Sequence, residues 1–207
     1  VDLAARQAAT RRSVAEMFVN LGRRNQALIN RQPAFIDHLE HGEQDPDKLD
    51  DLFRLDHLAT RMRRNAESLL VLAGAEQPRR WSASVEIGDV VRSALSEIED
   101  YHQVEVGRFE PVYVSGGLVA DLAHLLAELL ENATTFSPPT TPVRVSGRMV
   151  AEGYVLSVVD GGIGMDSTSM EDTNRRIGAT TNFDQTPSKV LGLYVVGRLA
   201  VRHGVKV

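Results

Sequence analysis

The sequence of 207 residues contains no cysteine. Disulfide bonds, thiolate zinc sites and a cysteine nucleophile are therefore excluded, and the composition is compatible with a reducing compartment. Long apolar runs are lacking too, since no segment approaches the roughly 18 apolar residues that cross a bilayer. The first residues do not show the charged-then-apolar order of a signal peptide. We therefore expect an intracellular chain without a membrane segment of its own.

A strong excess of positive charge is also lacking. The formal net charge is −5, and basic residues occur in pairs along helical sequence rather than in a patch with interleaved aromatic residues. A nucleic-acid partner is therefore not expected. The apolar content of 43% is enough for a sizeable core in one large domain or two modest ones.

Two stretches in the first third have the apolar spacing of paired helices. Mostly apolar positions, with the polar Asn25 and Gln32 among them, follow alternating steps of four and three over residues 14–39, and apolar positions do so again over residues 52–73. This spacing is typical of a coiled-coil seam. Asp45 and Pro46 fit the N-cap and first residue of the second helix, and Gly74 fits its C-terminal stop.

An antiparallel helical hairpin is therefore predicted over residues 1–74. Because one hairpin leaves its apolar stripes half covered, we expect two copies to pair into a homodimeric four-helix bundle. A monomeric hairpin packed on the following domain is the alternative. Residues 75–82 break the periodicity and are predicted to form a linker.

The remaining residues, 83–207, mix helical and strand patterns. Helical spacing is found over 85–101, 118–134, 170–177 and 190–203, and strand-like alternation over 103–106, 111–115, 143–150 and 154–159. Helices on one face of a mixed, mainly antiparallel sheet would give an α+β fold, an α/β sandwich after the hairpin. The last strand is expected to be incomplete at Val207, and the first residues are expected to continue a longer helix.

A carboxylate and three glycines follow the apolar run at residues 155–159. Asp160 at the end of this predicted strand can accept a hydrogen bond from the exocyclic amine of adenine, whereas the guanine carbonyl would be repelled. The glycines allow the loop to turn sharply and approach a nucleotide closely. A purely structural turn is the alternative. The residues predicted to form this wall of an ATP site are Asp160, Gly162, Ile163, Gly164 and Met165.

Two further elements favour a nucleotide. Glu128 and Asn132 are four residues apart and share a helix face, where Asn132 offers Mg²⁺ a carbonyl oxygen and Glu128 can orient or deprotonate an attacking group. A solvated helix face is the alternative. At the start of the last helix, the amides near Leu191 and Gly192 and the helix dipole favour phosphate, and Lys189 adds a positive charge.

The order of these parts resembles the histidine kinases of the GHKL superfamily, which also holds gyrase, a heat-shock chaperone and MutL. Residues 18–26, 55–64, 124–133 and 191–200 are similar to the actinobacterial sensor-kinase-like proteins of the conservons, which are related to nitrate-sensor kinases. The resemblance covers almost the whole chain. It implies a dimerisation and phosphotransfer hairpin before a Bergerat-type ATP-binding domain, in the cytoplasmic portion of a membrane-anchored receptor.

The resemblance also implies roles for single residues and for partners. In the family scheme Asn132 holds Mg²⁺, Asp160 binds the adenine of ATP, and residues 164–192 form a lid over the phosphates. The implied partners are a roadblock-type protein and a small GTPase, or a response regulator.

The sequence departs from the family pattern in the hairpin and in the lid. The comparable stretch of the first helix, residues 20–26, has no histidine, and His57 on the second helix is the alternative phosphoacceptor unless it is a solvated surface histidine. Ser188 and Val190 stand where the lid pattern has glycines, and Thr135 stands where a basic residue is usual. Weaker or altered ATP binding is expected from this lid.

Three functions therefore remain open. The first is a histidine kinase that autophosphorylates a hairpin histidine. The second is a pseudokinase scaffold that dimerises and signals through partner proteins without phosphotransfer. The third, an ATP-hydrolysing clamp, would need Glu128 to activate water, and a hairpin placed before the ATP domain argues against it.

Overall fold

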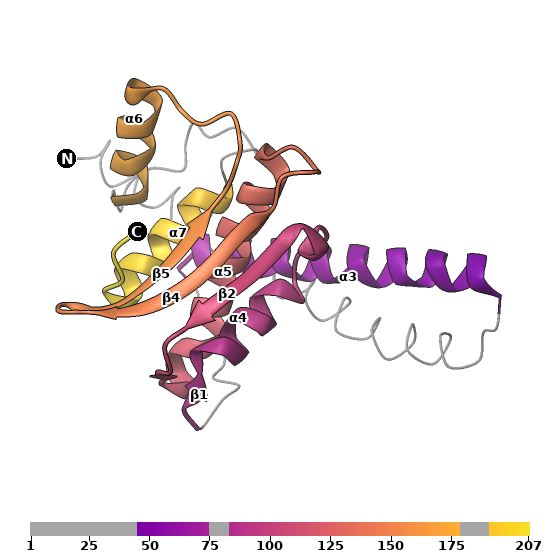
Figure 1. Cartoon of the computed structure of the whole chain (residues 1–207), viewed down its shortest axis with the longest axis horizontal. Helices are drawn as coiled ribbons and strands as arrows, with labels where there is room; N and C mark the ends of the chain where they lie inside the picture. Colours follow the sequence, from indigo (N-terminus) through magenta and orange to yellow (C-terminus); the bar gives the residue numbers. More distant parts are fainter. Residues whose placement is uncertain (1–44, 75–82, 179–190) are drawn as a thin grey trace, which may run out of the picture. The chain divides into compact units, whose positions relative to one another are not determined.

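The computed structural model describes residues 45–74, 83–178 and 191–207 of the chain (Figure 1). The chain divides into two compact units, Val1–Gln77 and Pro78–Val207. The predicted first helix, the predicted linker and the part of the lid that contains Lys189 lie outside the described residues. No helix in the three described ranges has the length and apolar character needed to cross a membrane.

The described part of the first unit is helix α3 (Pro46–Leu72). Its first turn is closed by the Asp45 carbonyl, which accepts a hydrogen bond from the Leu49 amide at 3.0 Å. At its end Gly74 has a φ of 79°, a left-handed conformation that favours glycine, and its amide donates to the Val71 carbonyl at 3.0 Å. The predicted start and stop of this helix are confirmed.

The predicted seam on α3 is only partly buried. Ala59 and Ala66 are buried, whereas Leu55 and Met62 are about half exposed. Apolar surface therefore remains on this helix face, and the homodimeric four-helix bundle stays a prediction. His57 lies within α3, but its side chain is not among those described.

The second unit contains two small sheets. The larger has the order β2-β4-β5, with β2 parallel to β4 and β4 antiparallel to β5. Its strands are β2 (Val104–Phe109), β4 (Val143–Val150) and β5 (Gly153–Val159). In the smaller sheet β1 (Val85–Glu86) pairs antiparallel with β3 (Tyr113–Val114). The mixture of helices with parallel and antiparallel strand pairs is the mixed α+β architecture that the sequence predicted.

Three helices cover one face of the larger sheet (Figure 1). They are α4 (Ile87–Leu95), α5 (Gly116–Phe136) and α7 (Leu191–His203). The core between the layers is formed by apolar side chains of α4, α5 and β4, among them Ile87, Val90, Leu126, Leu130, Val143 and Val145. On β4 these buried valines alternate with the exposed Arg144 and Arg148, as expected for a sheet with one buried face.

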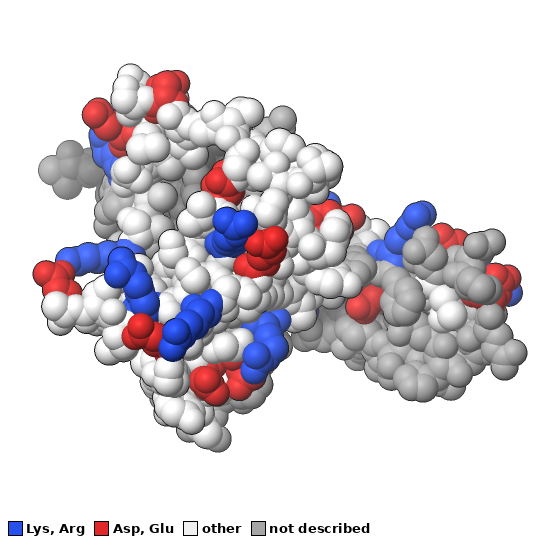
Figure 2. Space-filling view, in the orientation of Figure 1, with Lys and Arg blue, Asp and Glu red and all other residues white. Residues whose placement is uncertain are grey.

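The other face of this sheet carries acidic and basic side chains mixed together (Figure 2). Glu105 on β2 and Arg144 on β4 are register neighbours, and the Arg144 Nε atom donates to Glu105 Oε2 at 2.9 Å. Both side chains are exposed, so this ion pair contributes about 0–1 kcal/mol to stability.

The helix predicted over residues 85–101 is wrong at both ends. Its first two residues pair with β3 instead, and α4 ends at Leu95, before a short 3₁₀ helix η1 (Tyr101–Gln103). Ile98 follows α4 but is still buried in the core, which explains why the apolar period continues past the end of the helix.

Helix α6 (Ser167–Gly178) begins three residues earlier than predicted. The Asp166 carboxylate accepts hydrogen bonds from the Ser169 amide at 2.8 Å and from the Ser169 hydroxyl at 2.9 Å. These bonds favour the charged form and lower the pKa of Asp166. The carboxylate therefore acts as a helix cap that apolar spacing could not reveal.

Candidate functional site

A cavity of about 1160 Å³ is lined by residues of α5, of β5 and of the turn after β5. Most of its lining is apolar, and the C-terminal residues 204–207 contribute to it. Six of the residues predicted for the ATP site lie on its wall, namely Asn132, Asp160, Gly162, Ile163, Gly164 and Met165. The structure thus brings the helix element and the glycine loop of the prediction together.

The Asp160 carboxylate is held within the turn that follows β5. Its Oδ1 atom accepts a hydrogen bond from the Gly162 amide at 2.8 Å. The neighbouring Gly161 amide donates to the Ser137 hydroxyl at 3.2 Å. One carboxylate oxygen is therefore used to fix the turn, and the other can accept a hydrogen bond from a ligand in the cavity.

Two glycines shape this turn. A Cβ atom on Gly162 would lie 2.7 Å from the Phe136 carbonyl oxygen, which is backbone and cannot move aside easily. Gly164 has a φ of 68°, which side chains disfavour. The sharp turn predicted from the glycines is therefore present. Ile163 between them is 93% exposed, so the turn presents an apolar side chain to solvent.

Asn132 contributes a polar group to the wall on the α5 side. Its Nδ2 atom is buried and has no hydrogen-bond partner among the residues that the structure describes. A buried donor without a partner costs about 1–3 kcal/mol. The Asn132 side chain lines the cavity as well, and its carbonyl oxygen suits Mg²⁺.

The first turn of α7 lies against Glu128 and Asn132. A Cβ atom on Gly192 would be 2.5 Å from Glu128 Oε2 and 3.6 Å from Asn132 Nδ2. The Glu128 carboxylate therefore occupies space that any other residue at position 192 would fill. Leu191, the other predicted residue here, is the first residue of α7.

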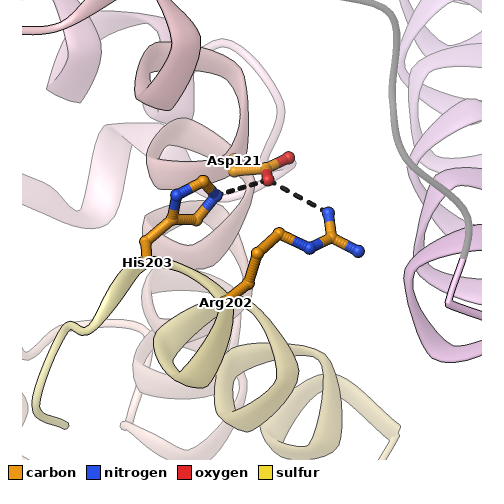
Figure 3. A network of polar contacts seen from close by, with 3 residues as sticks. All are labelled: Asp121, Arg202 and His203. Atoms are coloured by element: carbon orange, nitrogen blue, oxygen red, sulfur yellow. Dashed lines mark hydrogen bonds and ion pairs between the residues drawn. The ribbon is translucent and has the colours of Figure 1, made fainter.

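At its other end α7 is fastened to α5 by a polar network (Figure 3). The largely buried carboxylate of Asp121 on α5 accepts a hydrogen bond from Arg202 Nη1 at 3.1 Å, and its Oδ2 atom lies 2.6 Å from His203 Nε2. Both ends of α7 are thus placed along α5, which fixes Gly192 beside the cavity wall.

His124 lies beside the predicted residue Glu128, a contact that the sequence did not predict. It is buried one helical turn before Glu128, and its Nε2 atom lies 3.4 Å from Glu128 Oε1. The ring is therefore placed to orient the Glu128 carboxylate. The signal was the same four-residue spacing that joined Glu128 to Asn132, continued one turn toward the start of the helix.

Residues 117–207 match the family described as histidine kinase-, DNA gyrase B-, and HSP90-like ATPase. The matched residues lie within the region, 83–207, for which the sequence predicted an ATP-binding domain of the GHKL type. No curated protein matches the chain.

Several solved structures resemble the chain, among them two that are described as histidine kinases. Full-length ShkA in complex with AMPPNP has a TM-score of 0.53 and 18% identity, covering 91% of this chain and 41% of ShkA. The mycobacterial sensor histidine kinase MprB has a TM-score of 0.46 and 23% identity, covering 59% of this chain and 80% of MprB. The blue-light activated histidine kinase of Erythrobacter litoralis has a TM-score of 0.44 and 17% identity, covering 84% and 56%. The likeness to ShkA concerns the fold, and the chain spans less than half of ShkA.

Proposed function

We propose that the second unit binds Mg²⁺-ATP and that the chain is the core of a sensor-like histidine kinase in signal transduction. The observation that carries this proposal is the cavity wall of a GHKL-type ATPase domain, in which Asp160 and Asn132 line one cavity. The Asp160 carboxylate suits an adenine amine, and the Asn132 side-chain carbonyl suits Mg²⁺.

Each residue then has a defined task. Asp160 accepts a hydrogen bond from the adenine amine with the oxygen that the Gly162 amide does not use. Asn132 would hold Mg²⁺ through its carbonyl oxygen, and the amides at the start of α7 would serve as donors to the phosphates. Glu128, beside Gly192, orients the attacking group. Bound Mg²⁺-ATP supplies the γ-phosphoryl group and neutralises part of its charge.

Finer parts of the proposal rest on the sequence patterns and on the resemblance to the sensor-kinase-like proteins of the conservons. They are a homodimer through residues 1–74, His57 as phosphoacceptor, Lys189 beside the phosphates and a place in the cytoplasmic portion of a membrane-anchored receptor of the conservon type. The proposed partners are a roadblock-type protein and a small GTPase, or a response regulator.

A pseudokinase scaffold is the second candidate. It is favoured by the lack of histidine at residues 20–26 and by Ser188 and Val190 in place of lid glycines. In this alternative the cavity binds nucleotide without phosphotransfer, and the helices relay a signal to partner proteins.

Calorimetry with Mg²⁺ and a non-hydrolysable ATP analogue tests the binding proposal. We expect the unaltered chain to bind and Asp160→Asn to lose about 10- to 100-fold in affinity, because a hydrogen bond to a charged group is lost. Asp166→Asn is the matched control, since it removes the same charge from the α6 cap rather than from the cavity wall. No binding by the unaltered chain would contradict the proposal.

Labelling with γ-phosphate-labelled ATP separates the kinase from the scaffold. Acid-labile label on the full chain that is lost in His57→Ala supports the kinase with His57 as acceptor. Label that survives this substitution rules out His57. Nucleotide binding without any label favours the scaffold.

A further inference from the structure

A glutamine outside the cavity wall holds the loop on which the Asp160 turn rests. Gln103, the last residue of η1, is buried, with 7% of its surface exposed. Its Nε2 atom donates to the Pro138 carbonyl at 2.9 Å and to the Thr141 carbonyl at 2.8 Å. One side-chain amide thus joins both ends of a four-residue turn that lies more than thirty residues further along the chain.

This turn needs an outside donor because of its composition. Residues 138–142 contain three prolines, which have no amide hydrogen to donate. Inside the turn, the Thr141 amide donates to the Pro138 carbonyl at 2.9 Å. The side-chain amide of Gln103 donates two further hydrogen bonds to the carbonyls of this turn. Neither a glutamate nor a leucine at position 103 could donate them.

The same prolines place Ser137. A residue before proline is driven out of the helical region, and Ser137 has φ −97° and ψ 148°, which ends α5. The Ser137 hydroxyl then accepts a hydrogen bond from the Gly161 amide at 3.2 Å, and Ser137 is buried.

Three contacts connect this loop with the Asp160 turn. The first is the Ser137–Gly161 hydrogen bond. In the second, the Thr141 side chain occupies the space where a Cβ atom of Gly161 would be. In the third, the Phe136 carbonyl lies 2.7 Å from a Cβ atom built on Gly162. The position of the turn is therefore set by residues 136–141.

We propose that Gln103 and Ser137 are positioning residues for base recognition, which together set the place of the Asp160 carboxylate and so the preference for adenine over guanine. This inference rests on the proposed nucleotide function of the cavity. A carboxylate displaced by a few tenths of an ångström would bind adenine less well and would also repel the guanine carbonyl less strongly.

The first test follows backbone amides in the nucleotide-free chain. We expect Ser137→Ala and Gln103→Leu to speed amide hydrogen exchange at Gly161 and Gly162, measured by NMR, because the acceptor of Gly161 or its support is lost. Ser137→Thr keeps the hydroxyl and should restore slow exchange. Ser96→Ala is the matched control, since that hydroxyl bonds only to the nearby Ser93 carbonyl among the described contacts. Unchanged exchange in both variants would overturn the proposal without reference to nucleotide.

The second test compares non-hydrolysable ATP and GTP analogues by calorimetry on the same variants. Ser137→Ala should weaken binding of the ATP analogue by about threefold to tenfold and narrow its preference over the GTP analogue, and Ser137→Thr should restore both. A role limited to folding would lower Tm and leave this ratio unchanged, which would overturn the proposal. If the unaltered chain binds neither analogue while exchange responds as expected, the proposed nucleotide function fails, and with it the role in base recognition. If Gln103→Leu does not fold, the preference for the ATP analogue measured on Ser137→Ala tests the proposal.

Discussion

The two ends of the cavity wall are built differently. At the Asp160 end the neighbours of the critical glycine are backbone: Gly162 faces the Phe136 carbonyl, and the turn rests on a proline-rich loop. At the Asn132 end the neighbour of Gly192 is the tip of the Glu128 side chain, which can change rotamer. Backbone gives way only when a loop moves, whereas the Glu128 carboxylate can turn aside by a change of rotamer that gives up its 3.4 Å contact with His124 Nε2.

This difference suggests a division of labour in the proposed ATP site. The base end is rigid, as selection between adenine and guanine requires, because selection depends on the place of one carboxylate. The phosphate end is adjustable, and it is also where the sequence departs from the glycine pattern of the lid, at Ser188 and Val190.

The largest expected effect comes from Gly162→Ala. The added methyl group would lie 2.7 Å from the Phe136 carbonyl oxygen, so either α5 or the turn must move. We expect about 1–3 kcal/mol of lost stability, as for other overpacked sites. Thermal unfolding and calorimetry with the ATP analogue would show a lower Tm and weakened binding. A variant with normal Tm and normal affinity would contradict the claim that the Asp160 turn is rigid.

The next largest loss of stability is expected from breaking the polar contacts that hold α7 on α5. Asp121→Asn keeps the shape but removes the charge that faces Arg202 and His203 (Figure 3). We expect about 1–3 kcal/mol of destabilisation, because the Arg202 guanidinium would face a neutral acceptor instead of a carboxylate in a largely buried place. The measurement is urea unfolding of Asp121→Asn beside Arg144→Ala, which removes an exposed ion pair and should change stability by less than about 1 kcal/mol. Equal effects of the two substitutions would contradict this ranking.

Gly192→Ala is the counterpart of Gly162→Ala at the adjustable end. The new methyl group would be crowded only by the tip of Glu128, because Asn132 Nδ2 lies at an ordinary contact distance of 3.6 Å. The loss of stability should therefore be smaller than in Gly162→Ala, less than about 1 kcal/mol. Because Glu128 is displaced, hydrolysis or phosphotransfer should fall more than affinity for the ATP analogue. A loss of stability equal to that of Gly162→Ala would show that both ends are rigid.

The smallest expected effect concerns the cap of α6. The pKa of Asp166 is lowered by its hydrogen bonds to Ser169, so its contribution to stability is present above the unfolded pKa and is lost as pH falls through the lower folded pKa. Asp166→Asn should therefore be less stable than the unaltered chain at neutral pH, and the difference should shrink at acid pH below about 4. Thermal unfolding across this range checks the sign, and a difference that grows toward acid pH would contradict it.

The parts that sequence predicted well depend on local signals. Asp45, Pro46 and Gly74 set the ends of α3 because caps and stops act within one helical turn. The glycine turn after β5 was predictable because only glycine tolerates its backbone and its close neighbour.

Features that sequence missed depend on partners far away in the chain. Val85 and Glu86 form a strand because Tyr113 and Val114 pair with them, which helical spacing could not show. Gln103 serves a loop more than thirty residues away, and nothing in its own neighbourhood reveals that partner. The position of the hairpin's partner helix lies outside the described residues, so the dimer remains a prediction.

The most direct test of the central claim is a titration of the chain with Mg²⁺ and the non-hydrolysable ATP analogue, followed by NMR at the two ends of the cavity wall. The account predicts that the backbone amides of Gly161 and Gly162 and the side-chain amide of Asn132 shift together along one saturating curve. Saturation that leaves either end unperturbed, or shifts confined to other parts of the chain, would contradict a single nucleotide site that spans both.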